Sequence, residues 1–332
     1  MRAGLLLVAA LAAGCGAQSG LHLENGGRTV AVVPDSTTAP PSSGGSSSLP
    51  RQVTARVALG GTAAIAWDGD TTIWAAVWAG GPHLLGSLVA VDTRTGRPAP
   101  ALQLPPSQHP YLLAVDHGAL YVAATDTVLQ IDPHNGAILR SLRVHSPVRA
   151  LLDSRGSLWA TLDGGPLLRL DPATLAVRAS WHVTGAPDAV TTSPGSVFVT
   201  DDRERTLSRV SMRTGKVTAT VSIGAAGAGP PSQITVYADS IWVYEGASVL
   251  RLLLHGTQLV DRIGVPGAGG SIAAGTGGVW VSGSFGVARI DPASGVATTA
   301  LAVGRAGAAI ATTGNAVWVV QSQTGTLLRL AP

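Results

Sequence analysis

Seven copies of one short pattern run through the sequence, and this repetition limits the possible fold more than any other feature. In each copy a turn-forming segment precedes a short apolar segment that contains one large aromatic residue. These aromatics, 38 to 47 residues apart, are Trp74, Tyr121, Trp159, Phe198, Trp242, Trp280 and Trp318. A second apolar segment follows and usually ends in a turn, as in "VARIDPASG". A repeat of about 40 residues, rich in β-branched and aromatic residues, predicts an all-β, seven-bladed β-propeller with four strands in each blade.

The two ends of the repeat array predict how the ring closes. The last copy stops at "LLRLAP", after only three of its four expected strands. Ahead of the first copy, the segment Arg51–Leu59 alternates apolar residues with Thr54 and Arg56, as a strand does. We therefore expect this N-terminal strand to complete the last blade, because closure removes the exposed sheet edges. The alternative is that the segment only extends the linker before it.

The composition agrees with this fold and excludes some classes of function. Apolar residues make up 45% of the chain, charged residues only 12%, and there are 42 glycines. These values favour many short, covered strands joined by tight turns over amphipathic helices. The formal net charge of +3 is scattered along the chain, whereas nucleic-acid binding requires a clustered basic face. We expect no nucleic-acid partner, no cofactor and a monomer.

A separate pattern occupies the first fifteen residues. Arg2 precedes the apolar stretch Leu5–Ala13, and Cys15, the only cysteine of the chain, follows directly after Ala-Ala-Gly. The apolar stretch is too short to span a bilayer as an ordinary transmembrane helix. The segment resembles a bacterial lipoprotein signal peptide, although Ala12 stands where Leu is usual. The resemblance implies a signal peptide over residues 1–14 and lipidation of Cys15; an ordinary secretory signal is the alternative.

The residues after Cys15 predict a linker over 15–50. The stretch Pro34–Pro50, "PDSTTAPPSSGGSSSLP", is rich in Pro, Ser, Gly and Thr and cannot bury enough apolar surface to fold. The propeller would then span residues 51–332. Together, these segments predict an extracytoplasmic protein that is anchored by lipid to the membrane of a bacterial cell.

The repeat unit also resembles a known superfamily. Its clearest copies are "GGVWVSGSFGVARIDPASG" and "GSLWATLDGGPLLRLDPATL". They resemble the repeats of seven-bladed propellers of the streptogramin-lyase, YncE-like and NHL superfamily, and the resemblance covers residues 51–332. This architecture occurs in enzymes, sensors and plain binding modules, so the resemblance implies a fold and leaves the activity open.

The sequence does not contain a complete set of the residues that form an enzyme site in this superfamily. The streptogramin lyases that the repeats resemble use a metal with His and Glu side chains, and typically carry Glu directly after the aromatic strand. In this sequence the equivalent position is acidic only at Asp201 and Glu245, and the "P-H-G-I" loop of the lyases is absent. We therefore predict no catalytic residues and expect a binding or scaffold module. A diverged metal-dependent lyase or hydrolase is the alternative.

One face of the predicted propeller contains the candidate ligand-binding residues. The loops that lead into the innermost strands, and those that join second and third strands, surround the central channel on one face. Their charged and imidazole residues are His109, Asp126, His145, Asp163, Asp201, Asp202, Arg203 and Glu245. The two histidines and the first two aspartates come from neighbouring blades and could hold a hard or borderline metal ion. The partner at this face would be an unidentified protein or small molecule; alternatively, these residues only satisfy loops and water.

An arginine also recurs near the end of the third strand of most repeats. The five copies are Arg169, Arg209, Arg251, Arg289 and Arg329. We expect each to pack its aliphatic stem between blades and to pair with a turn aspartate such as Asp171 or Asp291. An anion-binding ring is the alternative. The seven aromatics are expected to form the core between blades.

Overall fold

The computed structural model describes residues 53–331 except 79–85, 106–107, 117, 125, 184, 225–228, 256, 266–269, 276, 302–305 and 322. These residues belong to one unit, Leu49–Pro332. The predicted signal peptide, Cys15 and the linker lie outside the described residues. Within the described part, no helix is long and apolar enough to cross a membrane.

In the described part of the chain, 28 strands form seven four-stranded antiparallel sheets. The first sheet contains β2 (Gly61–Trp67), β3 (Thr72–Trp78), β4 (Gly86–Asp92) and β5 (Leu102–Gln103). The second contains β6 (Pro110–Asp116), β7 (Ala119–Ala124), β8 (Thr127–Ile131) and β9 (Ile138–Arg143). The third contains β10 (Val148–Ser154), β11 (Ser157–Leu162), β12 (Leu167–Leu170) and β13 (Val177–Trp181).

The remaining four sheets repeat this order. The fourth contains β14 (Pro187–Ser193), β15 (Ser196–Asp201), β16 (Thr206–Ser211) and β17 (Val217–Ser222). The fifth contains β18 (Gln233–Tyr237), β19 (Ser240–Tyr244), β20 (Ser248–Leu253) and β21 (Leu259–Gly264). The sixth contains β22 (Ile272–Gly275), β23 (Gly278–Gly283), β24 (Gly286–Ile290) and β25 (Ala297–Leu301). The seventh contains β26 (Ala306–Thr312), β27 (Val317–Gln321), β28 (Thr326–Leu330) and β1 (Val53–Ala58).

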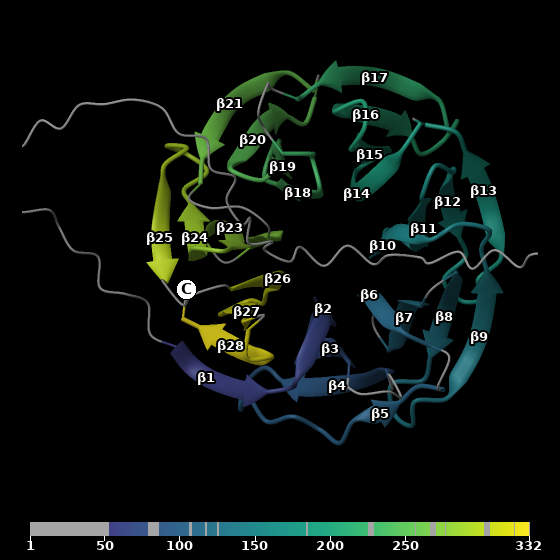
Figure 1. Cartoon of the computed structure of the whole chain (residues 1–332). Helices are drawn as coiled ribbons and strands as arrows, with labels where there is room; N and C mark the ends of the chain where they lie inside the picture. The colour runs from purple at the N-terminus through teal and green to yellow at the C-terminus, as the bar shows by residue number, and fades with distance from the viewer. Residues whose placement is uncertain are drawn as a thin grey trace, which may run out of the picture. The chain divides into compact units, whose positions relative to one another are not determined.

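The sheets are the blades of a ring. Figure 1 shows them side by side around a centre, with β2, β6, β10, β14, β18 and β26 innermost and strands such as β9, β13 and β17 at the periphery. The prediction of an all-β, seven-bladed propeller is confirmed.

The N-terminal strand closes the last blade, as the sequence predicts. Strand β1 pairs antiparallel with β28, with Val53 opposite Leu330 and Ala58 opposite Thr326. The strand ends at Ala58, one residue before the end of the predicted segment Arg51–Leu59, whose first two residues lie outside the described part of the chain. The turn before β28 requires glycine, because Gly325 has φ 60° and a Cβ there would lie 1.8 Å from a backbone carbonyl oxygen.

The seven aromatics form the core between the blades. Each lies in the second strand of its blade and is buried, with at most 7% of its surface exposed. Trp159, for example, packs against Val190 and Val197 of the next blade. Each of these aromatics belongs to a hydrophobic cluster that joins two neighbouring blades. The repeated aromatic thus stabilises the contact between blades and is not a ligand platform.

The predicted pairing of the repeated arginines with turn aspartates is wrong for the blade of β10–β13. Arg169 donates from Nε to the Ser157 hydroxyl at 2.9 Å, and its guanidinium lies 5.5 Å from the centre of the Trp159 ring. Asp171 instead pairs with Arg178 of the outer strand. The reason is that Arg169 stands directly opposite Trp159 in the register, so its side chain follows the tryptophan ring away from the turn.

Candidate functional site

β-Bulges or register irregularities interrupt the inner strands of five successive blades close to their starts, namely β26, β2, β6, β10 and β14. The register shifts at Tyr111 in β6, at Arg149 in β10 and at Asp188–Ala189 in β14. A bulge leaves its extra residue unpaired in the ladder and changes the direction of its side chain relative to the strand. Equivalent positions of neighbouring blades therefore present an aromatic, a basic and an acidic residue close to the ring centre.

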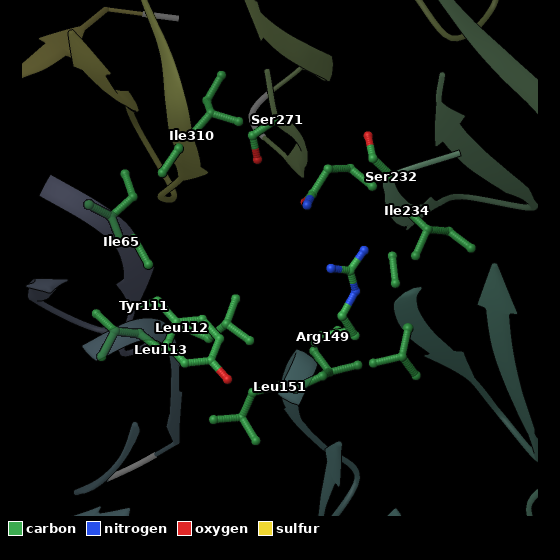
Figure 2. A pocket seen from close by; sticks show the side chains of 17 residues that line it. Ile65, Tyr111, Leu112, Leu113, Arg149, Leu151, Ser232, Ile234, Ser271 and Ile310 are labelled. Carbon is green, nitrogen blue, oxygen red and sulfur yellow. The ribbon is translucent and has the colours of Figure 1, made fainter. Parts of the chain in front are cut away.

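The inner ends of the blades surround a cavity of about 210 Å³ on the axis of the ring. Its wall is largely aliphatic, with Ile65, Leu151 and Ile310 among its members, and Ser232 and Ser271 add hydroxyl groups. Figure 2 shows these side chains around the cavity, with the guanidinium of Arg149 extending into it. Among the described residues that line the cavity, Arg149 is the only charged one.

Two carboxylates of the next blade hold Arg149. Its Nε lies 3.1 Å and its Nη2 3.0 Å from Oδ1 of Asp188, and the same Nη2 lies 3.4 Å from Oδ2 of Asp202. The hydroxyl of Thr161, one strand further out in the arginine's own blade, donates to the backbone carbonyl of Asp188 at 2.7 Å. The cluster of Arg149, Asp188 and Asp202, called here the mouth cluster, thus joins the blades of β10–β13 and β14–β17.

The mouth cluster contains two carboxylates and one guanidinium group. Burial raises the pKa of Asp188 to about 6, although the Arg149 charge acts to lower it; the carboxylates of Asp202 and Asp163 raise it further. The loss of hydration and the repulsion between carboxylates therefore outweigh the one guanidinium. Around Asp188, the guanidinium of Arg149 thus faces two carboxylates directly, with the charge of Asp163 nearby.

Tyr111 fixes the neighbouring side of the mouth. Its hydroxyl accepts a hydrogen bond from the backbone N–H of Val148 at 3.0 Å, which links the blade of β6–β9 to the start of β10. Burial raises the pKa of Tyr111, so the phenol is neutral at physiological pH. The residue next to Val148 is Arg149, so this bond helps to hold the bulge that directs the arginine into the channel.

Three of the residues predicted from sequence lie on the connections around the mouth. Asp202 belongs to the mouth cluster through its contact with Arg149. Asp163 is exposed in the turn between β11 and β12, where its N–H donates to the carbonyl of Pro147 at 2.9 Å, and its charge acts on Asp188. Arg203 is exposed in the turn between β15 and β16.

Asp201 and Glu245 have structural roles, although the sequence analysis placed both among the ligand-binding candidates. Both side chains are fully buried. Asp201 accepts hydrogen bonds from the backbone N–H groups of Ala186, Arg203 and Glu204 at 2.8 to 2.9 Å and so closes the turn between β15 and β16. Glu245 forms an ion pair with Arg262 on β21 of its own blade.

The other three candidates do not assemble into a metal site. Oδ2 of Asp126 accepts a hydrogen bond from Arg143 Nε at 2.9 Å, and this bond is the main cause of its lowered pKa. His109 is half-buried before β6, and His145 is exposed before β10. Within the described residues, which include these three and Asp163, no group of three or more His, Cys, Asp or Glu is placed to hold a metal ion.

Two residues of the mouth cluster were missed in the sequence analysis, namely Arg149 and Asp188. The signal was present in the segments "PVRALL" and "PDAVTT", where a charged residue interrupts the start of an otherwise apolar inner strand. Such a residue in a strand that faces a ring axis indicates either a local bulge or an unfavourable burial. Both residues lie within predicted strands, whereas the candidates predicted from sequence all come from loops.

Comparisons with known proteins support the fold alone. No protein-family model matches the chain, and none of the curated proteins matches it. Among solved structures, the β-propeller domain of Cps50 (Swd1) from Myceliophteria thermophila is similar at 12% identity and a TM-score of 0.73, over 85% of this chain and 100% of that domain. Virginiamycin B lyase from Staphylococcus aureus is similar at 16% identity and a TM-score of 0.69, over 84% of this chain and 98% of the lyase chain. The chain is a seven-bladed β-propeller.

Proposed function

We propose that this chain is a ligand-binding β-propeller of the bacterial cell envelope, held at the membrane by a lipid on Cys15. The binding site is the mouth of the axial channel, with Arg149, Asp188 and Asp202 at its centre and Asp163 beside them. The propeller acts as a binding or scaffold module. The identity to virginiamycin B lyase is too low to transfer the activity of that enzyme to this chain.

The observation that carries this proposal is the presence of the mouth cluster on an otherwise uncharged cavity. Ligand pockets are mostly apolar and contain a few polar groups that orient the ligand. Ionisable side chains with perturbed pKa values gather at such sites, and the pKa of Asp188 is raised to about 6.

The N-terminal residues support the location. An apolar segment that ends at the only cysteine, followed by a Pro- and Ser-rich stretch, matches the sequence pattern of a lipid anchor and a linker. A single acyl chain binds a membrane only marginally, whereas two or more anchor a protein stably, as a multiply acylated cysteine would.

Ligand-observed NMR with a library of small organic fragments tests the site. The full chain is compared with Ser232→Trp and Ser271→Trp, because each places an indole in the cavity from a partly exposed position. The matched control is Leu139→Trp on β9, where the side chain is 51% exposed at the periphery of the ring. We expect a set of fragments to bind the wild type and the control but neither blocking variant. The same fragments binding to folded blocking variants would place the site elsewhere.

Metabolic labelling with a fatty-acid analogue tests the anchor. In a bacterial host the full chain should incorporate the label and partition with membranes. The Cys15→Ser variant should lose the label and leave the membrane fraction. An unlabelled wild-type chain would remove the anchor from the proposal without affecting the channel site.

A further inference from the structure

The charges around the axial channel restrict the ligands that it can take. Arg149 is already engaged through Nε and Nη2 by Asp188 and Asp202, and the charge of Asp163 adds to theirs. Among the described residues, an incoming anion would approach three carboxylates and the guanidinium groups of Arg149 and the exposed Arg203. Near a protein surface two unit charges at 4 Å interact by about 4 kcal/mol, so one unmatched carboxylate already discriminates between a cation and an anion.

The cavity restricts the size and polarity of the rest of the ligand. Its volume of about 210 Å³ exceeds that of an apolar cavity of about 150 Å³ that accommodates benzene. Ile65, Leu151 and Ile310 provide an apolar wall, while Ser232 and Ser271 offer hydroxyl groups. A single ring or a short branched aliphatic group fits this space, and a larger body does not.

We infer that the channel mouth binds a small organic cation, a primary amine with a compact apolar body, whose ammonium group lies against the carboxylates of Asp188 and Asp202. The apolar body occupies the cavity, where its contact with the aliphatic wall removes apolar surface from water. This inference rests on the proposed function, since it assigns a ligand class to the same site.

The state of Asp188 agrees with this arrangement. The burial of its carboxylate and the neighbouring carboxylates favour its neutral form and raise its pKa. A second positive charge near Asp188 and Asp202 would stabilise both carboxylates, as a nearby opposite charge does. The bound amine would thus provide the positive charge that the ligand-free mouth cluster lacks.

Three probes of nearly equal shape test the charge of the ligand. Benzylammonium, benzyl alcohol and benzoate are titrated into the full chain by calorimetry at pH 7.5 and low salt. We expect benzylammonium to bind at least tenfold more tightly than benzoate, with the alcohol between them. Benzoate binding as tightly as benzylammonium, or no binding by any of the three, would overturn the inference.

Two substitutions locate the ammonium group. Asp202→Asn removes one carboxylate of the mouth cluster and is expected to weaken benzylammonium binding several-fold while leaving benzyl alcohol unchanged. The matched control is Asp126→Asn, which removes a carboxylate in the connection between β7 and β8 that pairs with Arg143. The control is expected to have no effect. Equal losses in both variants, or none in Asp202→Asn, would contradict the assignment.

The blocking variant Ser232→Trp separates this inference from the proposed function. If benzoate binds the wild type more tightly than benzylammonium does, and Ser232→Trp abolishes this binding, the inference of a cationic ligand is wrong but the channel site is retained. Probes that bind folded Ser232→Trp as tightly as the wild type would overturn both.

Discussion

The mouth cluster and the ion pair of Glu245 with Arg262 contain the same chemical groups but differ in their surroundings. Glu245 is fully buried and Arg262 is 31% exposed, and both belong to the blade of β18–β21. Arg149 is 40% exposed, faces two carboxylates of another blade and lines the axial cavity. The buried pair links the connection after β19 to β21, whereas the mouth cluster joins two blades beside the axial cavity, where we propose that a ligand binds.

Removal of the buried pair should give the largest effect on stability. Glu245→Ala leaves Arg262 without its carboxylate, and breaking a buried ion pair lowers the free energy of unfolding by about 3 kcal/mol. Urea unfolding of the variant and the wild type measures this difference. Glu245→Gln, which keeps the shape of the side chain, is the control and should lose less. A loss below about 1 kcal/mol for Glu245→Ala would show that the two sites do not differ as described.

The pH dependence of stability should reveal the mouth cluster. The pKa of Asp188 in the folded protein, about 6, lies above the ordinary aspartate value of 3.8. The folded state therefore binds a proton more tightly than the unfolded state between these pH values, so the contribution of Asp188 is present below about pH 4 and is lost as the pH rises through 6. At about 1.4 kcal/mol per pKa unit, the effect is at most about 3 kcal/mol.

Asp188→Asn checks this sign. The free energy of unfolding of the variant minus that of the wild type should increase between pH 4 and pH 7, because only the wild type loses the contribution of Asp188. Carboxyl groups with lowered pKa values, such as Asp171, destabilise the fold on acidification in both proteins and cancel in the difference. A difference that is constant with pH would mean that folding does not raise the pKa of Asp188.

The charge of Arg149 should affect binding more than stability. Arg149→Gln is expected to change the free energy of unfolding by no more than about 1 kcal/mol, because partly exposed ion pairs contribute little. The same substitution removes the positive charge from the mouth, so benzylammonium should bind more tightly to the variant. Urea unfolding and calorimetry measure the two quantities. Weaker binding of benzylammonium to the variant would contradict the inferred position of the ammonium group.

The smallest effect is expected at His145. This residue is exposed before β10, and a surface substitution there should change the free energy of unfolding by less than about 0.5 kcal/mol. His145→Ala should also leave benzylammonium binding unchanged. A loss of binding would extend the site from the mouth cluster to the loop, as the sequence analysis proposed.

Much of the fold could be predicted because its signals are local and repeated. The aromatic of each second strand, the turn after each third strand and the lone segment before the first repeat were sufficient to predict seven blades and their closure. The connections that contain the candidate residues were also predicted. The structural roles of Asp201 and Glu245 were not predicted. A carboxylate in a turn can either point to solvent or bind backbone N–H groups and arginine side chains of the protein.

The ring follows from local features of the sequence, because the spacing of the aromatics and the turn residues dictates the strands and the contacts between blades. The proposed binding site, in contrast, depends on contacts that form only in the folded ring. Arg149 and Asp188 are 39 residues apart, and Arg149 and Asp202 are 53 apart, so they meet only when two blades pack together. Their direction also depends on bulges that break the regular alternation of side chains along β10 and β14. The alternation of side chains along a single strand predicts neither the contact between blades nor the bulges, since both arise from the packing and pairing of a strand with its neighbours.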